Sequence, residues 1–345
     1  MKPLPRRAFL GAELPPDDEA FSPSGTRISA VTPGGMADRA DVRAGDTIVT
    51  LADLPVRTFA ELAAALRRAG AAAEAEIRYA RGATVRVSAT EVAPCPLEEI
   101  EGVGVGYGEL ATGGVRLRTI ATRVPEPRAV ILALPDLPCE SVEAESPLAD
   151  LAHGLARAGF DTLRFDRRGV GDSEGGPCGS LDFSTECADA AAALTHARTR
   201  AREREVPLVV FGHGAGGVIA AQLAGEHHVH GIITYGTPAA RLPAGPTGRS
   251  AAYHAQLDAI DPDALWGKVH APVLVVRGEH DWVIRAEDQA RIASLVVGTA
   301  SVIDLPGLDH ALGWHDSRAA SERDYGAGRF DAAIVRRIAG WIDRL

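Results

Sequence analysis

Apolar residues alternate with polar ones over four short runs in the first ninety residues, and one longer run repeats with the period of a helix. The longer run begins at a capping box, Thr58 to Glu61, and ends at Gly70, as an amphipathic surface helix does. The short runs are bounded by Gly, Pro or Asp and predict strands at residues 27–31, 47–51, 76–79 and 84–88. This pattern predicts a small α+β domain with a single helix.

From Arg128 onward, strand-like apolar runs alternate with helical stretches, which is typical of a doubly wound parallel sheet. The first predicted helix, residues 147–158, has Ser146 at its N-cap and Pro147 at its first position. The last predicted helix is residues 332–345. The predicted strands are residues 129–133, 162–165, 208–211, 231–235, 273–277 and 301–304. The predicted fold class is α/β with a mostly parallel sheet, preceded by the small α+β domain.

Prolines and acidic residues predict a linker at residues 93–102, between one domain at residues 1–96 and another at residues 103–345. The glycine-rich run at residues 102–108 would need a following helix to bind a dinucleotide. A strand-like run follows it instead, so the sequence predicts no cofactor. Residues 239–266 are too many for a simple crossover and predict a short lid.

Charge and composition exclude several classes of protein. A net charge of -10 over 345 residues argues against a nucleic-acid partner, which needs clustered Lys and Arg. No apolar stretch is long enough for a membrane helix, and no apolar segment typical of a secretory signal follows the N-terminus. The alanine- and arginine-rich composition suggests a bacterial origin. Free thiols in the cytoplasm are predicted from the scattered positions of Cys95, Cys139, Cys178 and Cys187.

Three motifs in the first domain occur in a distinctive order: FLGAEL from Phe9, VTPGGMA from Val31 and VRAGDTI from Val42. This order resembles PDZ domains of the bacterial, protease-associated type. The resemblance implies that a loop offers backbone N–H groups to the terminal carboxylate of a peptide or protein partner. Arg6 or Arg7 would add positive charge, and a degenerate module that only packs against its neighbour is the alternative. The implied carboxylate loop, residues 9–12, consists of Phe9, Leu10, Gly11 and Ala12.

The second domain resembles α/β hydrolases of the serine aminopeptidase and esterase type. The sequence VFGHGAGG from Val210 matches the strand-to-helix turn that carries the nucleophilic serine, but Gly214 holds that position. The loop GEHDWVI from Gly278 nominates Asp281 as the acid, and LPGLDHAL from Leu305 nominates His310 as the base. The resemblance implies that Asp281 orients His310.

The resemblance also places the oxyanion donors at the N–H groups of Ala215 and, in the loop after the third strand, Leu137. Pro135 in that loop has no N–H to donate, and the Asp136 carboxylate would repel an oxyanion unless it is protonated or turned away. Cys139 is an alternative, displaced nucleophile, and Asp136 with His310 is an alternative acid/base pair.

Two other groups have mainly structural interpretations. The cluster EHHVH at residues 226–230 lies between a predicted helix and strand and is interpreted as solvated rather than metal-binding, so no metal is predicted. Asp172 and Ser173 are interpreted as turn-forming residues.

Two hypotheses for function follow. The first is a repurposed hydrolase-fold protein that recognises a peptide and acts by binding or by acid/base chemistry at His310. The second is a serine peptidase or esterase in which Gly214 replaces the serine of an active parent. Loss of the nucleophile costs about 10⁶ in turnover, so neither hypothesis expects serine hydrolysis from the chain as written.

Overall fold

The computed structural model describes residues 3–15, 17–143, 146–239 and 248–345. The chain forms two compact units. Unit 1 comprises Met1–Leu97 and Arg168–Cys178, and unit 2 comprises Glu98–Arg167 and Gly179–Leu345. Residues 240–247 of the predicted lid lie outside the described residues.

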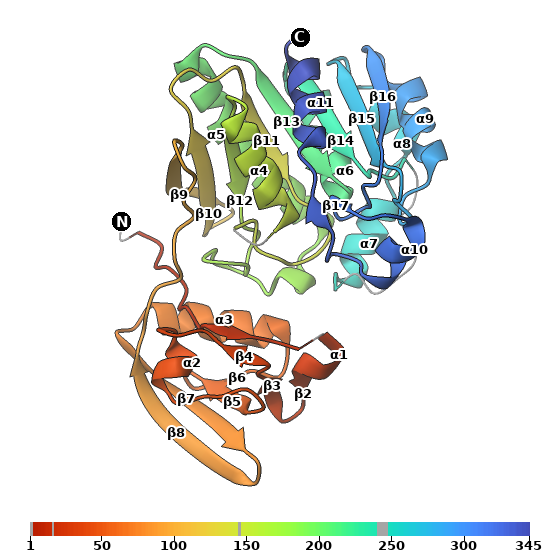
Figure 1. Cartoon of the computed structure of the whole chain (residues 1–345). Coiled ribbons are helices and arrows are strands. Elements are labelled where there is room, and N and C mark those ends of the chain that lie inside the picture. The colour runs from red at the N-terminus through yellow and green to blue at the C-terminus, as the bar shows by residue number, and fades with distance from the viewer. Residues whose placement is uncertain (1–2, 16, 144–145, 240–247) are drawn as a thin grey trace. The chain divides into compact units, whose positions relative to one another are not determined.

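Unit 1 is built on an antiparallel sheet with the strand order β2-β3-β5-β7-β8, and β6 pairs with β5 (Figure 1). A separate pair of strands, β1 and β4, lies outside that sheet. The strands are β1 (Ala12–Glu13), β2 (Phe21–Ser22), β3 (Gly25–Arg27), β4 (Ala30–Val31), β5 (Thr47–Leu51), β6 (Leu54–Pro55), β7 (Glu74–Arg81) and β8 (Thr84–Glu91). The helices are α1 (Asp17–Ala20), α2 (Met36–Arg39) and α3 (Phe59–Gly70).

Two expectations for this unit are wrong. The domain has three helices among its described residues rather than one, because α1 and α2 are single turns too short to show a hydrophobic period. The predicted strand at residues 27–31 divides between β3 and β4. The chain changes partner there, since the Ile28 N–H donates to Asp46 O and the Ser29 N–H donates to Glu13 O.

Helix α3 begins and ends as its sequence predicts. Thr58 is the N-cap, and its side chain accepts a hydrogen bond from the Glu61 N–H at 3.1 Å. At the other end, Gly70 allows the N-terminal arm (residues 6–8) to pass close to the helix. A Cβ at Gly70 would lie 2.0 Å from the Arg6 carbonyl oxygen. The Ala8 N–H donates to Leu66 O at 2.9 Å in the same place.

We therefore expect Gly70→Ala to destabilise unit 1 by about 1 to 3 kcal/mol, as overpacking at a close contact does. Urea unfolding followed by circular dichroism measures this change. Tryptophan fluorescence should not change its midpoint, since all four tryptophans lie in unit 2. The control is Gly340→Ala in a helix of unit 2, where the nearest atom to a new Cβ is 3.9 Å away. A control as destabilising as Gly70→Ala would contradict the packing argument.

Unit 2 contains an eight-stranded sheet with the order β16-β15-β14-β13-β11-β12-β10-β9. The six strands from β16 to β12 run parallel, whereas β10 and β9 are antiparallel at one edge. This confirms the predicted fold class. The strands are β9 (Gly104–Thr112), β10 (Val115–Arg123), β11 (Val130–Leu134), β12 (Asp161–Phe165), β13 (Leu208–His213), β14 (Gly231–Tyr235), β15 (Val273–Gly278) and β16 (Ala300–Leu305).

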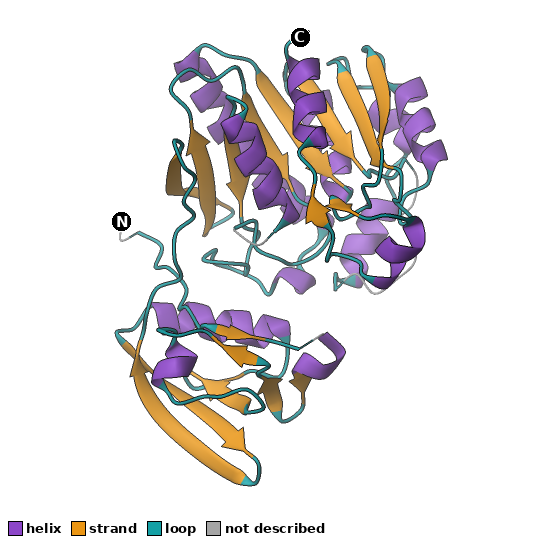
Figure 2. Ribbon diagram, in the orientation of Figure 1, coloured by secondary structure: helices purple, strands orange, loops and turns teal. Residues whose placement is uncertain are grey.

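Helices cover both faces of this sheet (Figure 2). One face packs against α4 (Pro147–Arg157) and α11 (Ala333–Ile342). The other face packs against α5, α6, α7, α8 and α9, which span Phe183–Arg204, Ala215–Glu226, Ala251–Asp258, Pro262–Trp266 and Ala286–Leu295. The remaining elements are β17 (Gly313–Trp314), α10 (Arg318–Arg323), β18 (Arg329–Phe330) and a 3-10 turn at Cys178–Ser180.

The sequence pattern did not predict α5, because its ten buried residues include four alanines and three charged residues, which give little contrast with the polar positions. The glycine-rich run before β10 forms most of strand β9. The described part of the predicted lid forms α7 and α8, where Tyr253 and Trp266 are fully buried. Within the described ranges, no helix has both the length and the apolar character that crossing a membrane requires.

Candidate functional site

Gly214 lies at the sharp turn between β13 and α6 and has φ +50° and ψ -119°. Its N–H donates to the Tyr235 carbonyl oxygen at 2.9 Å. The flanking glycines are required by close backbone contacts, because a Cβ at Gly212 would lie 2.4 Å from Gly216 O. A Cβ at Gly216 would lie 2.5 Å from Leu134 O. The turn therefore has a tight geometry, and the residue at its tip, Gly214, has no side chain.

The Asp136 carboxylate fills the space beside Gly214. A Cβ built on Gly214 would lie 1.8 Å from Asp136 Oδ1 and 2.2 Å from its Cγ. Asp136 Oδ1 also accepts a hydrogen bond from the Ala215 N–H at 2.8 Å. The carboxylate thus takes both the volume of a serine side chain and the donor expected to bind an oxyanion. Leu137, the other expected donor residue, has its side chain in the core, and its role as a donor stays a prediction.

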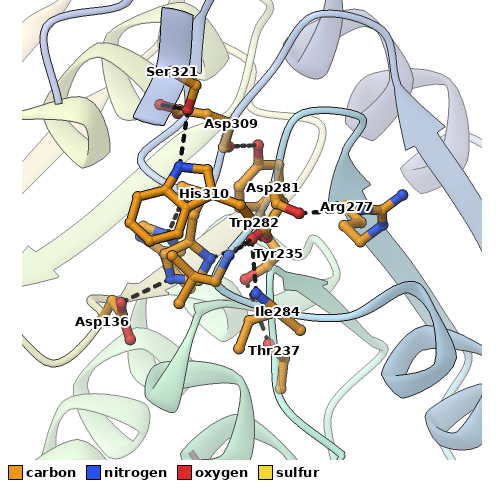
Figure 3. Close-up of polar contacts among 12 residues, drawn as sticks. Asp136, Tyr235, Thr237, Arg277, Asp281, Trp282, Ile284, Asp309, His310 and Ser321 are labelled. Atoms are coloured by element: carbon orange, nitrogen blue, oxygen red, sulfur yellow. Dashed lines mark hydrogen bonds and ion pairs between the residues drawn. The ribbon is translucent and has the colours of Figure 1, made fainter. Parts of the chain in front are cut away.

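His310 lies between two carboxylates (Figure 3). Its Nδ1 is 3.0 Å from Asp281 Oδ2, and its Nε2 is 3.1 Å from Asp136 Oδ2. The other oxygen of Asp281 accepts hydrogen bonds from the N–H groups of Val283 and Ile284, at 2.9 and 2.8 Å. These bonds fix the Asp281 carboxylate, which in turn orients the imidazole. The structure therefore brings Gly214, Asp136, Asp281 and His310 together in one site.

The charges of this site stabilise one another. Burial alone would lower the pKa of His310, but hydrogen bonds and charges from Asp136 and Asp281 outweigh it and raise that pKa to about 10. Burial alone would raise the pKa of Asp136, but its hydrogen bond to His310 and the nearby charge outweigh it and hold that pKa well below the usual range. At neutral pH the group is an imidazolium between two carboxylates, which we call the ion triad (Asp136, His310 and Asp281).

His213 adjoins the ion triad and was missed by sequence analysis. Its Nε2 donates to the His310 carbonyl oxygen at 2.7 Å, and burial lowers its pKa. With Asp136 and His310 it is the one set within the described residues whose ligand atoms lie within 4.8 Å of one another. Each of the three already has a hydrogen-bond partner in the cluster, so the ion triad accounts for their geometry and we assign no metal. The sequence signal that could have identified His213 was its position in the VFGHGAGG turn, directly before Gly214.

Arg167 holds the loop that carries Asp136, and sequence analysis did not single it out. Its guanidinium donates to the carbonyl oxygens of Pro135 at 3.0 Å and Pro138 at 2.9 Å, and also to that of Asp136. Its Nε binds Glu186, which is buried and paired on its other side with Arg249. These contacts fix the loop with its carboxylate toward Ala215. The only sequence signal was that Arg167 lies two residues after the end of β12, next to Arg168.

The prediction of four free thiols is wrong. Cys139 and Cys178 are disulfide-bonded, whereas Cys95 and Cys187 are in the thiol form. A bonded Cys139 cannot act as a displaced nucleophile, so that alternative is also removed. Burial raises the pKa of the Cys187 thiol to about 12, which makes it unreactive.

The carboxylate loop of unit 1 has its carbonyl groups turned inward. The carbonyls of Phe9, Leu10 and Gly11 accept hydrogen bonds from the N–H groups of Met36, Ala37 and Thr32. In a planar trans peptide the C=O and the next N–H point in opposite directions. The N–H groups of residues 10–12 therefore point away from these partners, as a carboxylate-binding loop requires. The Phe9 N–H itself donates to Ala93 O at 2.8 Å, so it is not one of the outward donors.

Comparison with known proteins divides the chain in the same order. A family model described as a PDZ domain matches residues 27–81, and one described as serine aminopeptidase S33 matches residues 126–259. Among curated protein sequences, none matches this chain.

Solved structures with the same fold include DcsB, a monoglyceride lipase variant and Est1E. DcsB in complex with its substrate analogue has a TM-score of 0.57 at 18% identity, over 70% of this chain and 99% of its own. A soluble variant of monoglyceride lipase from Saccharomyces cerevisiae has a TM-score of 0.56 at 13% identity, over 72% and 99%. Est1E from Butyrivibrio proteoclasticus with bound ferulic acid has a TM-score of 0.52 at 15% identity, over 69% and 96%. At such identities the likeness establishes the fold alone. The chain is therefore an N-terminal PDZ domain followed by an α/β-hydrolase domain with a match to the S33 serine aminopeptidases.

Proposed function

We propose that this protein is a peptide-recognising pseudohydrolase, in which the PDZ domain binds a peptide or protein C-terminus and the hydrolase domain does not carry out serine hydrolysis. One observation supports this above the others. The Asp136 carboxylate occupies the volume of a serine side chain at position 214 and accepts the Ala215 N–H. A substrate carbonyl would have to displace an ion-paired carboxylate that is only 14% exposed before it reached that donor.

Acid/base chemistry at His310 is less well supported. A general base must be able to accept a proton near the working pH, and a pKa of about 10 leaves His310 protonated there. Its two ring nitrogens both face carboxylates, and its side chain is only 4% exposed. The ion triad is better suited to holding the loops of the domain in place than to exchanging protons with a ligand.

The hypothesis of a serine hydrolase with a simple Ser-to-Gly change fits the site less well. In such a protein the pocket beside Gly214 would be open for the missing hydroxyl, and the Ala215 N–H would be available to substrate. Here both are taken by Asp136, whose loop is held by Arg167 through three carbonyl oxygens. The nucleophile position and the oxyanion loop therefore both differ from those of an active serine hydrolase, as expected for a repurposed site.

Peptide recognition predicts a requirement for a free carboxylate. Short peptides with a free C-terminus and an apolar last residue should bind the full chain about tenfold more tightly than their amidated copies, because outward N–H groups of residues 10–12 favour a charged acceptor. Fluorescence polarisation with labelled peptides measures both affinities. Peptides labelled at the C-terminus serve as a second blocked set. Equal affinity of the free and amidated forms would remove carboxylate recognition from the proposed function.

A further inference from the structure

Residues 168–178 follow β12 in the chain and belong to unit 1. They form a compact turn, in which the Gly169 N–H donates to Glu174 O at 3.0 Å and the Ser173 N–H donates to Val170 O at 2.9 Å. Asp172 lies in the middle of this turn, and its side chain is completely buried. The sequence predicts only a turn-forming role for Asp172. Its burial instead requires charged or hydrogen-bonding partners.

Among those partners are the two arginines that precede the carboxylate loop. Arg6 NH1 binds Asp172 Oδ2 at 2.6 Å, and the backbone N–H of Arg7 donates to Asp172 Oδ1 at 2.9 Å. The Arg7 guanidinium is a further 3.7 Å ion-pair partner of the same oxygen. Arg6 is itself oriented by the carbonyl oxygens of Cys95 and Pro96, at 3.2 and 2.8 Å. The arm therefore forms a built receptor for a carboxylate, from two cations and a backbone donor.

A second contact holds the same turn against helix α3. Arg67 NH1 donates to the Gly169 carbonyl oxygen at 2.7 Å. Arg67 follows Leu66, whose carbonyl oxygen accepts the Ala8 N–H. The turn is thus held by the N-terminal arm and by α3 at the place where those two elements meet, immediately before the carboxylate loop.

We propose that Asp172 is an internal ligand of Arg6 and Arg7, and that its negative charge lowers the affinity of the adjoining carboxylate loop for the C-terminal carboxylate of a peptide. This inference rests on the proposed function of the PDZ domain. Arg7 is three residues before Leu10, a distance of about 10 Å along extended chain. The two guanidinium charges would attract a carboxylate at residues 10–12, and the negative charge of Asp172 cancels part of that attraction.

The test compares the full chain with its Asp172→Asn variant, using the same labelled peptides with free and amidated C-termini. Asp172→Asn keeps the shape of the side chain and removes its charge, so free-acid peptides should bind about tenfold more tightly than to the unsubstituted protein. Amidated peptides should be unaffected. Asp53→Asn is the matched control in the same unit, because Asp53 is 80% exposed and pairs only at 3.9 Å with Arg68.

A second variant covers the case in which Asp172→Asn fails to fold. Arg67→Gln removes the hydrogen bond from α3 to the turn and leaves Arg6, Arg7 and Asp172 in place, so it should tighten free-acid binding in the same direction by a smaller factor. Circular dichroism establishes which variants are folded.

The outcomes separate the inference from the proposed function. Unchanged free-acid affinity in the folded variants would overturn the internal-ligand inference and leave peptide recognition standing. If free-acid peptides bind none of the proteins, both proposals fail. If Asp53→Asn tightens binding as much as Asp172→Asn does, the effect is one of net charge and the inference is again overturned.

Discussion

Gly214→Ser alone should leave the protein inert toward fluorophosphonate probes and simple esters, although His310 and Asp281 already have the spacing of a catalytic dyad. A serine Cβ would lie 1.8 Å from Asp136 Oδ1, so the new side chain would meet a carboxylate rather than an open pocket. The Ala215 N–H would still be bound to Asp136 and unable to stabilise an oxyanion. Probe labelling followed by intact-mass measurement checks this result.

Asp136→Gly added to Gly214→Ser should restore reactivity. The second change removes the carboxylate from the serine volume and releases the Ala215 donor. Oxyanion donors contribute about 10² to 10³ in rate, so the double variant should exceed either single variant by at least about 10². The effects should be strongly non-additive, because the groups act as one catalytic unit.

The matched control is Asp136→Gly alone, which opens the pocket without supplying a nucleophile and should remain unlabelled. Robust labelling of Gly214→Ser by itself would contradict the repurposed-site interpretation and favour a serine hydrolase whose nucleophile was substituted. Circular dichroism of each variant ensures that a lack of labelling reports chemistry rather than misfolding.

Asp136→Asn should destabilise unit 2 by about 3 kcal/mol near pH 6, because it removes the charge of one carboxylate that faces a buried imidazolium.

The ion triad also makes the free energy of unfolding depend on pH. His310 has a pKa of about 10 in the fold and about 6.5 when unfolded, so its contribution is fully present below about pH 6.5 and is lost as pH rises toward 10. Asp136 has a lowered pKa, so its contribution is present above about pH 4 and is lost in acid.

Urea unfolding between pH 5 and 10, followed by tryptophan fluorescence, measures this dependence in unit 2, which holds all four tryptophans. The unsubstituted protein should lose stability steadily across the alkaline half of that range. In Asp136→Asn the loss should be shallower, because the pKa of His310 falls when one of its partners loses its charge.

Asp304→Asn is the control for this series, since the Asp304 side chain is 58% exposed and its ion pair with Arg277 contributes little. It should leave the alkaline slope of the unfolding free energy unchanged. An alkaline slope in Asp136→Asn as steep as in the unsubstituted protein would show that Asp136 does not raise the pKa of His310.

The sequence by itself determined the two folds and located the strand-to-helix turn at Gly214. Apolar runs that alternate with helical stretches predicted most strands of the eight-stranded sheet, and local glycine spacing located the turn at Gly214. Asp281 and His310 followed from motifs that come directly after strands, where the backbone fixes the direction of the next few residues. Each of these inferences depends on neighbours in the chain, which a single sequence displays.

What the tertiary structure decided were the partners of individual charged side chains. The sequence left open whether the Asp136 carboxylate repels an oxyanion, is protonated or is turned away. Only the fold places it beside Gly214 and against His310, which is 174 residues later in the chain. The anchoring of its loop by Arg167 and the capture of Asp172 by Arg6, 166 residues earlier, are of the same kind. Such pairings depend on which rotamers packing leaves open between segments far apart in the chain, and no local pattern records that choice.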